Sequence, residues 1–131
     1  MVLDLTSVQA KRYGVLSCEM QDTLGEATRV MVTEDVSTLV VVDEHGFLAG
    51  VITRTDMIRA FLRSENWRRE LVQAYMQSDV ITVMEHTRLQ AVAEILIERH
   101  IHRVVVVRME NERPRPVGVI SAADLLYHMN K

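Results

Sequence analysis

The chain is short of the residues on which several common functions depend. Among its 131 residues there is one cysteine, Cys18, which excludes an internal disulfide and a cysteine-based metal cluster. One tryptophan, three tyrosines and two phenylalanines are too few for a protein that stacks nucleic-acid bases on aromatic rings. No apolar run approaches the ~20 residues that cross a bilayer. The sequence also lacks a Walker loop, a dinucleotide-binding glycine fingerprint and the nucleophile elbow of a hydrolase.

The bulk composition is that of an ordinary soluble globular protein. Hydrophobic residues make up 48% and charged residues 25% of the chain. A formal net charge of −3 and a sequence pI near 5.9 disfavour generic binding to DNA. Residues 1–11 lack the charged-then-apolar order of a signal peptide, so we expect a cytoplasmic protein with no membrane partner. A chain of this length forms one compact unit or two half-domains that share a core.

What the sequence does contain is an internal repeat. The segment Gly50–Asp56 (GVITRTD) returns as Gly118–Asp124 (GVISAAD), and each copy follows a valine-rich run and opens a helical pattern. A shift of about 65 residues aligns the rest of the two halves. Repetition at a fixed period indicates a duplicated structural unit. The repeat alone therefore predicts the architecture, independently of any single motif.

Each copy has the pattern of a strand, an amphipathic helix, two further strands and a closing helix. We expect the strands at 15–17, 39–42 and 47–52 in the first copy and at 80–82, 104–107 and 117–120 in the second. Unbroken β-branched runs in the middle strand of each copy indicate strands covered on both faces. The predicted fold class is α/β (α+β), with tandem β-α-β-β-α repeats packed with pseudo-two-fold symmetry.

Helix caps and turns support this assignment. Thr23 with Glu26, and Thr87 with Gln90, have the spacing of a capping box at the start of the first helix of each copy. The segment Asp43–Gly46 predicts a hairpin turn in which the glycine takes a positive φ. The second hairpin is expected to be longer by three residues and to end in the loop Arg113–Pro116.

The repeat also sets the expected domain boundaries. The first repeat covers 8–63 and the second covers 78–129, with a helical connector at 64–77. The helix is predicted because apolar side chains recur there at i, i+4 and i+8, at Trp67, Leu71 and Tyr75. The nearby arginines are expected on a solvated helix face; they are Arg59, Arg63, Arg68 and Arg69.

The pairs Thr53–Asp56 and Ser121–Asp124 lie where a strand gives way to a helix. A hydroxyl followed three residues later by an acid is also the pattern of a simple helix cap. Three features favour a ligand site: both copies have the motif, a glycine precedes it, and the carboxylate emerges at the carboxyl end of a strand. A carboxylate accepts hydrogen bonds from the vicinal hydroxyls of ribose, and a helix N-terminus suits phosphate. The motif therefore favours a nucleoside-containing ligand.

The order of these elements resembles the cystathionine-β-synthase (CBS) domain. The resemblance rests on Ile101–Val107 (IHRVVVV), the hairpin, and the Gly-h-h-[Ser/Thr]-x-x-Asp motif, and it covers about residues 8 to 129. Two copies form a CBS pair, also called a Bateman module. The resemblance implies clefts between the repeats that bind AMP, ADP, ATP or S-adenosylmethionine as regulatory ligand, with no required cofactor. It also implies pairing into a homodimer.

The resemblance assigns ligand contacts to the strand-to-helix junctions and to the strand entries. The implied contacts to ribose hydroxyls, with help at the phosphate, are Thr53, Asp56, Ser121 and Asp124. The implied phosphate contacts are His102 and Arg103. The implied base contacts are Leu16 and Ile81.

The two copies differ where phosphate is expected. The second copy has His102–Arg103 where the first has Ser37–Thr38, and the first has Arg54 where the second has Ala122. We expect the better phosphate site at the first junction, formed by Thr53, Arg54, Asp56 and an Arg103 that reaches in from the second copy. The second site is expected to be weaker, to take a less charged ligand or to stay empty.

The sequence thus predicts a regulatory sensor, not an enzyme, that signals through dimer geometry to a separate effector protein. No catalytic residue and no metal site is expected; His100 and His102 alternate as metal ligands do, but the sequence names no further ligand. Cys18 is expected in the core. Two alternatives are open: a structural or protein-interaction subunit whose motifs are only helix caps, and an enzyme with an unrecognised site. The stripe Met57, Ile58, Phe61 and Leu62 belongs either to the core or to a dimer interface, and the interface is favoured because the terminal helices of this architecture are exposed unless paired.

Overall fold

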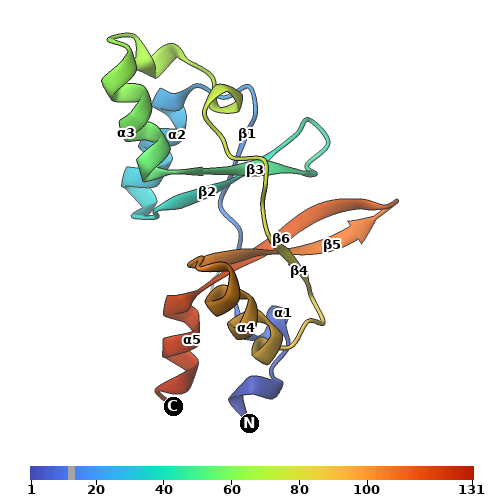
Figure 1. Cartoon of the computed structure of the whole chain (residues 1–131). Helices are drawn as coiled ribbons and strands as arrows, with labels where there is room; N and C mark the ends of the chain where they lie inside the picture. The colour runs from blue at the N-terminus through green and yellow to red at the C-terminus, as the bar shows by residue number, and fades with distance from the viewer. Residues whose placement is uncertain (12–13) are drawn as a thin grey trace. The chain divides into compact units, whose positions relative to one another are not determined.

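The chain folds into two compact units, shown in Figure 1 as a computed structural model that describes residues 1–11 and 14–131. One unit is Leu16–Val80, which holds the first repeat and the segment that follows it. The other combines the N-terminal segment Met1–Val15 with Ile81–Lys131, which holds the second repeat. No helix within the described ranges is long and apolar enough to cross a membrane.

The unit Leu16–Val80 is built on a three-stranded sheet in the order β1-β2-β3, with β1 parallel and β3 antiparallel to β2. Helices α2 and α3 lie side by side against this sheet (Figure 1). The core consists of side chains from all these elements, among them the fully buried Leu24, Leu39 and Ile52. The elements are β1 (Ser17–Glu19), α2 (Leu24–Glu34), β2 (Thr38–Val42), β3 (Leu48–Thr53) and α3 (Arg54–Arg63).

The second unit repeats this arrangement with a sheet in the order β4-β5-β6 and the same parallel and antiparallel pairing. The N-terminal segment packs on it: the Leu89 N–H donates to the Leu5 carbonyl at 2.7 Å, and the buried His128 ring places Nε2 2.7 Å from the Ala10 carbonyl oxygen. The elements are η1 (Val2–Asp4), α1 (Ser7–Ala10), β4 (Thr82–Met84), α4 (Leu89–Arg99), β5 (Arg103–Glu110), β6 (Arg113–Ser121) and α5 (Ala122–Met129).

The structure confirms the repeat and its β-α-β-β-α order. Helices α2 and α4 even end alike, in the left-handed residues Asp35 (φ 52°) and His100 (φ 55°). The central strands β2 and β5 are buried over consecutive residues, as their unbroken apolar runs predict. In the first hairpin, Gly46 takes the expected positive φ of 83°.

The second hairpin differs from its prediction. The three additional residues lengthen both strands, and the turn itself is only Asn111–Glu112, where both residues have positive φ. Pro114 and Pro116 lie within β6 and pair with Met109 and Val107. Proline is tolerated there because β6 is an edge strand of its sheet.

Three local expectations need correction. The α4 cap is Arg88, without a side-chain hydrogen bond, because the Thr87 hydroxyl instead accepts from the Met84 N–H at 3.0 Å. The connector does not form the single helix expected; it contains two 3₁₀ helices, η2 (Trp67–Arg69) and η3 (Val72–Ala74), and packs within the first unit. Met57 of the expected interface stripe is buried in the core, whereas the rest of the stripe is exposed.

Candidate ligand-binding site

Asp56 closes the junction between β3 and α3. The Thr53 backbone N–H donates to Asp56 Oδ2 at 2.8 Å, and the Thr53 hydroxyl donates to the same oxygen at 2.9 Å. Arg59, one turn further along α3, donates to Oδ1 at 3.0 Å. The helix-cap pattern of the sequence is therefore present, and a cation binds the same carboxylate.

Asp124 has the corresponding place in the second unit. The Ser121 backbone N–H donates to Asp124 Oδ2 at 2.8 Å, and the Ser121 hydroxyl donates to it at 3.1 Å. The position that corresponds to Arg59 is occupied by Tyr127. The two junctions thus share one capping geometry and differ in the residue one turn further along the helix, which is Arg59 in α3 and Tyr127 in α5.

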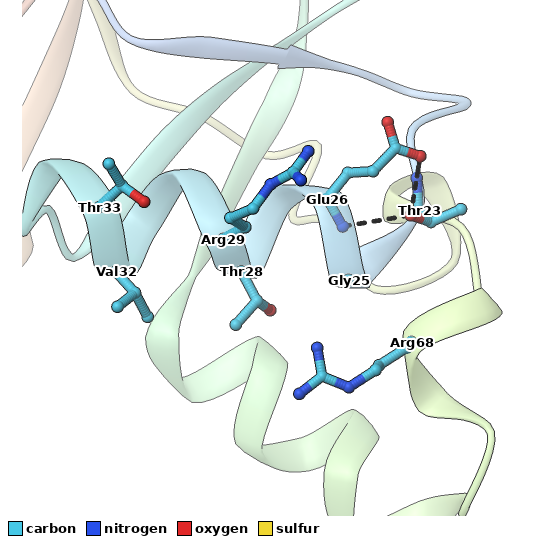
Figure 2. A pocket seen from close by; sticks show the side chains of 8 residues that line it. All are labelled: Thr23, Gly25, Glu26, Thr28, Arg29, Val32, Thr33 and Arg68. Carbon is cyan, nitrogen blue, oxygen red and sulfur yellow. Dashed lines mark hydrogen bonds between the residues drawn. The ribbon is translucent and has the colours of Figure 1, made fainter.

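Burial separates these two junctions from an ordinary helix cap. The Thr23–Glu26 pair at the start of α2 makes the same reciprocal hydrogen bonds, but Glu26 is exposed (Figure 2). Asp56 and Asp124 are only 1% and 6% exposed. A carboxylate needs no burial to cap a helix, and burial of a charge costs free energy. The caps of α3 and α5 therefore place their carboxylates where an ordinary cap would not.

Each junction also has a polar neighbour across the sheet. Thr38 is the cross-strand partner of Thr53, and Arg103 is that of Ser121, so each pair of side chains leaves the same face of its sheet. The Thr38 hydroxyl is buried and has no hydrogen-bond partner among the residues that the structure describes. Burial lowers the pKa of the half-buried Arg103 guanidinium. The first junction therefore has an unsatisfied hydroxyl where the second has a cation.

Two of the other predicted contacts lie beside the central strands, and a third lies at the start of α5. The carbonyls of Leu16 and Ile81 accept from Val40 and Val105, each at 3.1 Å, which places both residues next to the central strands. The His102 carbonyl accepts the first N–H of α5 at 2.9 Å.

Arg54 is less firmly placed. Its guanidinium pairs with Asp35 at 3.3 Å, and both side chains are exposed, so the pair opens at little cost. The structure thus groups Leu16, Thr53, Arg54 and Asp56 in one unit, and Ile81, His102, Arg103, Ser121 and Asp124 in the other. The reach of Arg103 into the first site stays a prediction.

A family model for the CBS domain matches the chain twice, over residues 10–63 and 72–131. The chain belongs to the CBS domain family. The two matches correspond to the two repeats, and the α+β fold with its two three-stranded sheets is that of a CBS domain pair. The family resemblance and the expected α+β class, with its tandem β-α-β-β-α repeats, are confirmed.

Relatives of this CBS pair occur within much longer proteins. Inosine-5′-monophosphate dehydrogenase of Methanocaldococcus jannaschii is 30% identical over 112 residues, 86% of this chain but 21% of that protein. The 5′-AMP-activated protein kinase subunit gamma-3 of Sus scrofa is 45% identical over 51 residues, 39% of this chain and 10% of that protein. Among solved structures, the CBS domain pair of protein MJ0100 in complex with 5′-methylthioadenosine and S-adenosyl-L-methionine has a TM-score of 0.78 at 24% identity, covering 96% of this chain and 98% of that one.

Two groups that contact Asp56 were missed in the sequence. The sequence places Arg59 on a solvated face, and its side chain is 58% exposed, but its i, i+3 spacing from Asp56 also permits the ion pair that forms. Gln77 places its side-chain Nε2 3.4 Å from each oxygen of Asp56. No local signal could show this contact, because the connector folds back onto its own CBS repeat.

The alternative chemical sites gain no support from the structure. Cys18 is buried in β1, and burial, followed by the nearby charge of Asp22, raises the pKa of its thiol to about 12. Such a thiol is protonated at neutral pH and is a poor nucleophile. His100 and His102 are exposed, and the described residues contain no cluster of three or more side chains that could hold a metal ion.

A hollow of about 570 Å³ lies along α2 and η2, away from the residues predicted to bind ligand. Its lining includes Gly25, Thr28, Arg29 and Arg68. In Figure 2 Thr28 and Val32 extend toward Arg68, whereas the guanidinium of Arg29 extends to the opposite side of α2. The two cations therefore do not converge on one point, and this hollow does not replace the junctions as the candidate site.

Proposed function

We propose that this CBS pair is a regulatory sensor that binds an adenosine-containing ligand at its strand-to-helix junctions. The ligand is AMP, ADP, ATP or S-adenosylmethionine, and the carboxylates of Asp56 and Asp124 accept its ribose hydroxyls. Thr53 and Ser121 assist at the sugar or phosphate, Arg54, His102 and Arg103 contact phosphate, and Leu16 and Ile81 contact the base. The protein has no catalytic step of its own.

The observation that supports this proposal most is the burial of both motif carboxylates at repeated junctions. Each carboxylate lies just after the carboxyl end of a strand and at the N-terminus of a helix. The carboxylate can accept hydrogen bonds from hydroxyls there, and the N–H groups of the helix N-terminus can donate to phosphate. The unsatisfied Thr38 hydroxyl beside Thr53 supplies a further group that a polar ligand can satisfy. The likeness to a CBS pair in complex with two adenosine compounds supports the ligand class.

The proposal is tested by a melting screen of the purified protein with AMP, ADP, ATP and S-adenosylmethionine. A ligand present at 100 times its dissociation constant stabilises the folded state by about 2.7 kcal/mol. For a domain of this size that corresponds to a rise in melting temperature of roughly 10 °C. A screen with no rise for any of the four ligands at millimolar concentration would instead favour the structural or protein-interaction subunit.

We further propose that the CBS pair forms a homodimer and passes ligand occupancy to a separate effector protein through dimer geometry. The interface is the exposed apolar face of α3, formed by Ile58, Phe61 and Leu62. Helix α5 exposes Leu126 and Met129 in the corresponding repeat. Apolar faces of this kind on a folded protein mark interaction surfaces. A ligand shifts such a dimer only by its differential affinity for the available geometries.

Leu62→Glu is expected to convert the dimer to a monomer. The substitution places a charge in the apolar contact, and sedimentation equilibrium should show the mass of one chain instead of two. Ile97→Glu on α4 is the control, because Ile97 is 76% exposed and Leu62 is 77% exposed. A wild-type monomer, or a dimer that survives Leu62→Glu, contradicts the assignment.

A further inference from the structure

Asp56 is not accessible to a ligand in the conformation described. It is 1% exposed, and its carboxylate already accepts three short hydrogen bonds, from the Thr53 N–H, the Thr53 hydroxyl and Arg59. An ionised carboxylate offers about four acceptor positions. The Gln77 amide lies across the remaining position, 3.4 Å from both oxygens. A ribose hydroxyl can therefore be accepted only after one of these donors leaves.

Gln77 is the donor most easily displaced. The Thr53 N–H belongs to the backbone of the α3 cap, and Arg59 forms a charged hydrogen bond at 3.0 Å. The Gln77 amide is a neutral donor, and its contacts with Asp56 are longer than those of Arg59. Because Gln77 is exposed, its amide can turn away from Asp56 and exchange these hydrogen bonds for hydrogen bonds to water. Its position beside the two oxygens is also the one from which a ribose hydroxyl would donate.

The backbone of Gln77 ties this side chain to the sheet. Its N–H donates to the Val51 carbonyl at 2.8 Å, and its carbonyl accepts from the Val51 N–H at 2.9 Å. Gly50 permits this approach, because a Cβ at that position would come under 3.0 Å from the Gln77 carbonyl oxygen. The connector thus adds a short antiparallel pairing to the edge strand β3, and a few residues later the chain enters β4.

We propose that Gln77 is a gate on the first ligand site: in the ligand-free protein its amide occupies the sugar position of Asp56, and a ribose hydroxyl displaces it. The proposal rests on the function proposed above. Displacement weakens the attachment of the connector to β3. Ligand occupancy is thereby passed along the chain into β4, the first strand of the second repeat.

The gate is tested by calorimetric titration of wild type, Gln77→Ala and Gln73→Ala with AMP and, in parallel, with S-adenosylmethionine. Gln73 is an exposed glutamine of the same connector, and its backbone N–H donates to the Met20 carbonyl at 3.0 Å. Removal of a competing amide should lower the dissociation constant of Gln77→Ala about threefold, the effect of one weak hydrogen bond. Gln73→Ala should bind as wild type does. With 2′,3′-dideoxy-AMP, which lacks both ribose hydroxyls, the gain in Gln77→Ala should disappear.

Hydrogen exchange on the wild-type protein gives a second readout that requires no variant. Ligand should speed exchange of the backbone amides of Val51 and Gln77 while the amides of α3 stay protected. The gate is wrong if the ligand binds through Asp56, Gln77→Ala has the same affinity as wild type or a lower one, and the exchange rates of the two amides do not change. The proposed function is not affected by that outcome. If none of AMP, ADP, ATP and S-adenosylmethionine binds wild type, the proposed function fails and the gate fails with it.

Discussion

Asp56→Ala is expected to remove ligand binding at the first junction. The carboxylate accepts a ribose hydroxyl in the position that the Gln77 amide leaves, and a hydrogen bond to a charged group contributes about 1.5–3 kcal/mol. Its loss weakens binding by roughly 10- to 100-fold. The protein should also lose about 1 kcal/mol of stability with the α3 cap. Calorimetry with the ligand that gives the largest melting shift measures the first effect, and urea unfolding measures the second.

Glu26→Ala is the matched control for Asp56→Ala. It removes the same kind of cap from α2 but at an exposed position, so the free energy of unfolding should fall by a similar ~1 kcal/mol while ligand binding is unchanged. Asp124→Ala reports on the second junction in the same way. If Asp56→Ala and Asp124→Ala both retain wild-type affinity, the carboxylates are helix caps only and the assigned sites are wrong.

Gly50→Ala is expected to have the largest effect on stability. The added Cβ would come under 3.0 Å from a backbone oxygen of Gln77, which is itself held by two hydrogen bonds to Val51. The connector must either leave β3 or strain the buried strand. Overpacking of this kind, with the loss of two backbone hydrogen bonds, costs about 2–3 kcal/mol. Urea unfolding followed by circular dichroism measures this loss.

Gly118 provides the control, because it holds the same place in the repeated motif. A Cβ at Gly118 would meet only the far methylenes of the Lys11 side chain, which can move aside. Gly118→Ala should therefore change the free energy of unfolding by less than about 1 kcal/mol. Equal losses in the two variants would show that the connector is not what makes Gly50 necessary.

The sequence predicted the elements that the duplication repeats. The two copies agree on strand, helix, strand pair and helix, because each position is supported twice and the apolar runs of β2 and β5 are unambiguous. Predictions that depend on neighbouring residues are confirmed: the Thr53–Asp56 and Ser121–Asp124 helix caps form, and Gly46 has a positive φ. Such features depend on residues within four positions of one another.

The predictions that the structure corrects concern segments without a counterpart in the other repeat, or segments that contact distant parts of the chain. The apolar spacing of Trp67, Leu71 and Tyr75 predicts a helix, but the connector forms 3₁₀ turns because Leu71 bridges Thr23 and Gln77 bridges Val51. Those tertiary contacts outweigh the weak helical preference of a short segment. Because the connector folds back onto its own repeat, Gln77 contacts Asp56, and the sequence alone does not predict this contact. The sequence predicts a loop at Arg113–Pro116, whereas both prolines lie within β6. An edge strand such as β6 tolerates proline, which lacks a backbone N–H, whereas a central strand does not.

A crystal structure with the most stabilising ligand tests the central claim most directly. The account predicts an adenosine compound whose ribose hydroxyls lie within hydrogen-bond distance of the Asp56 carboxylate, the Asp124 carboxylate or both. At an occupied first site, the Gln77 amide should have left Asp56. A ligand seated elsewhere, without contact to either carboxylate, would contradict the account.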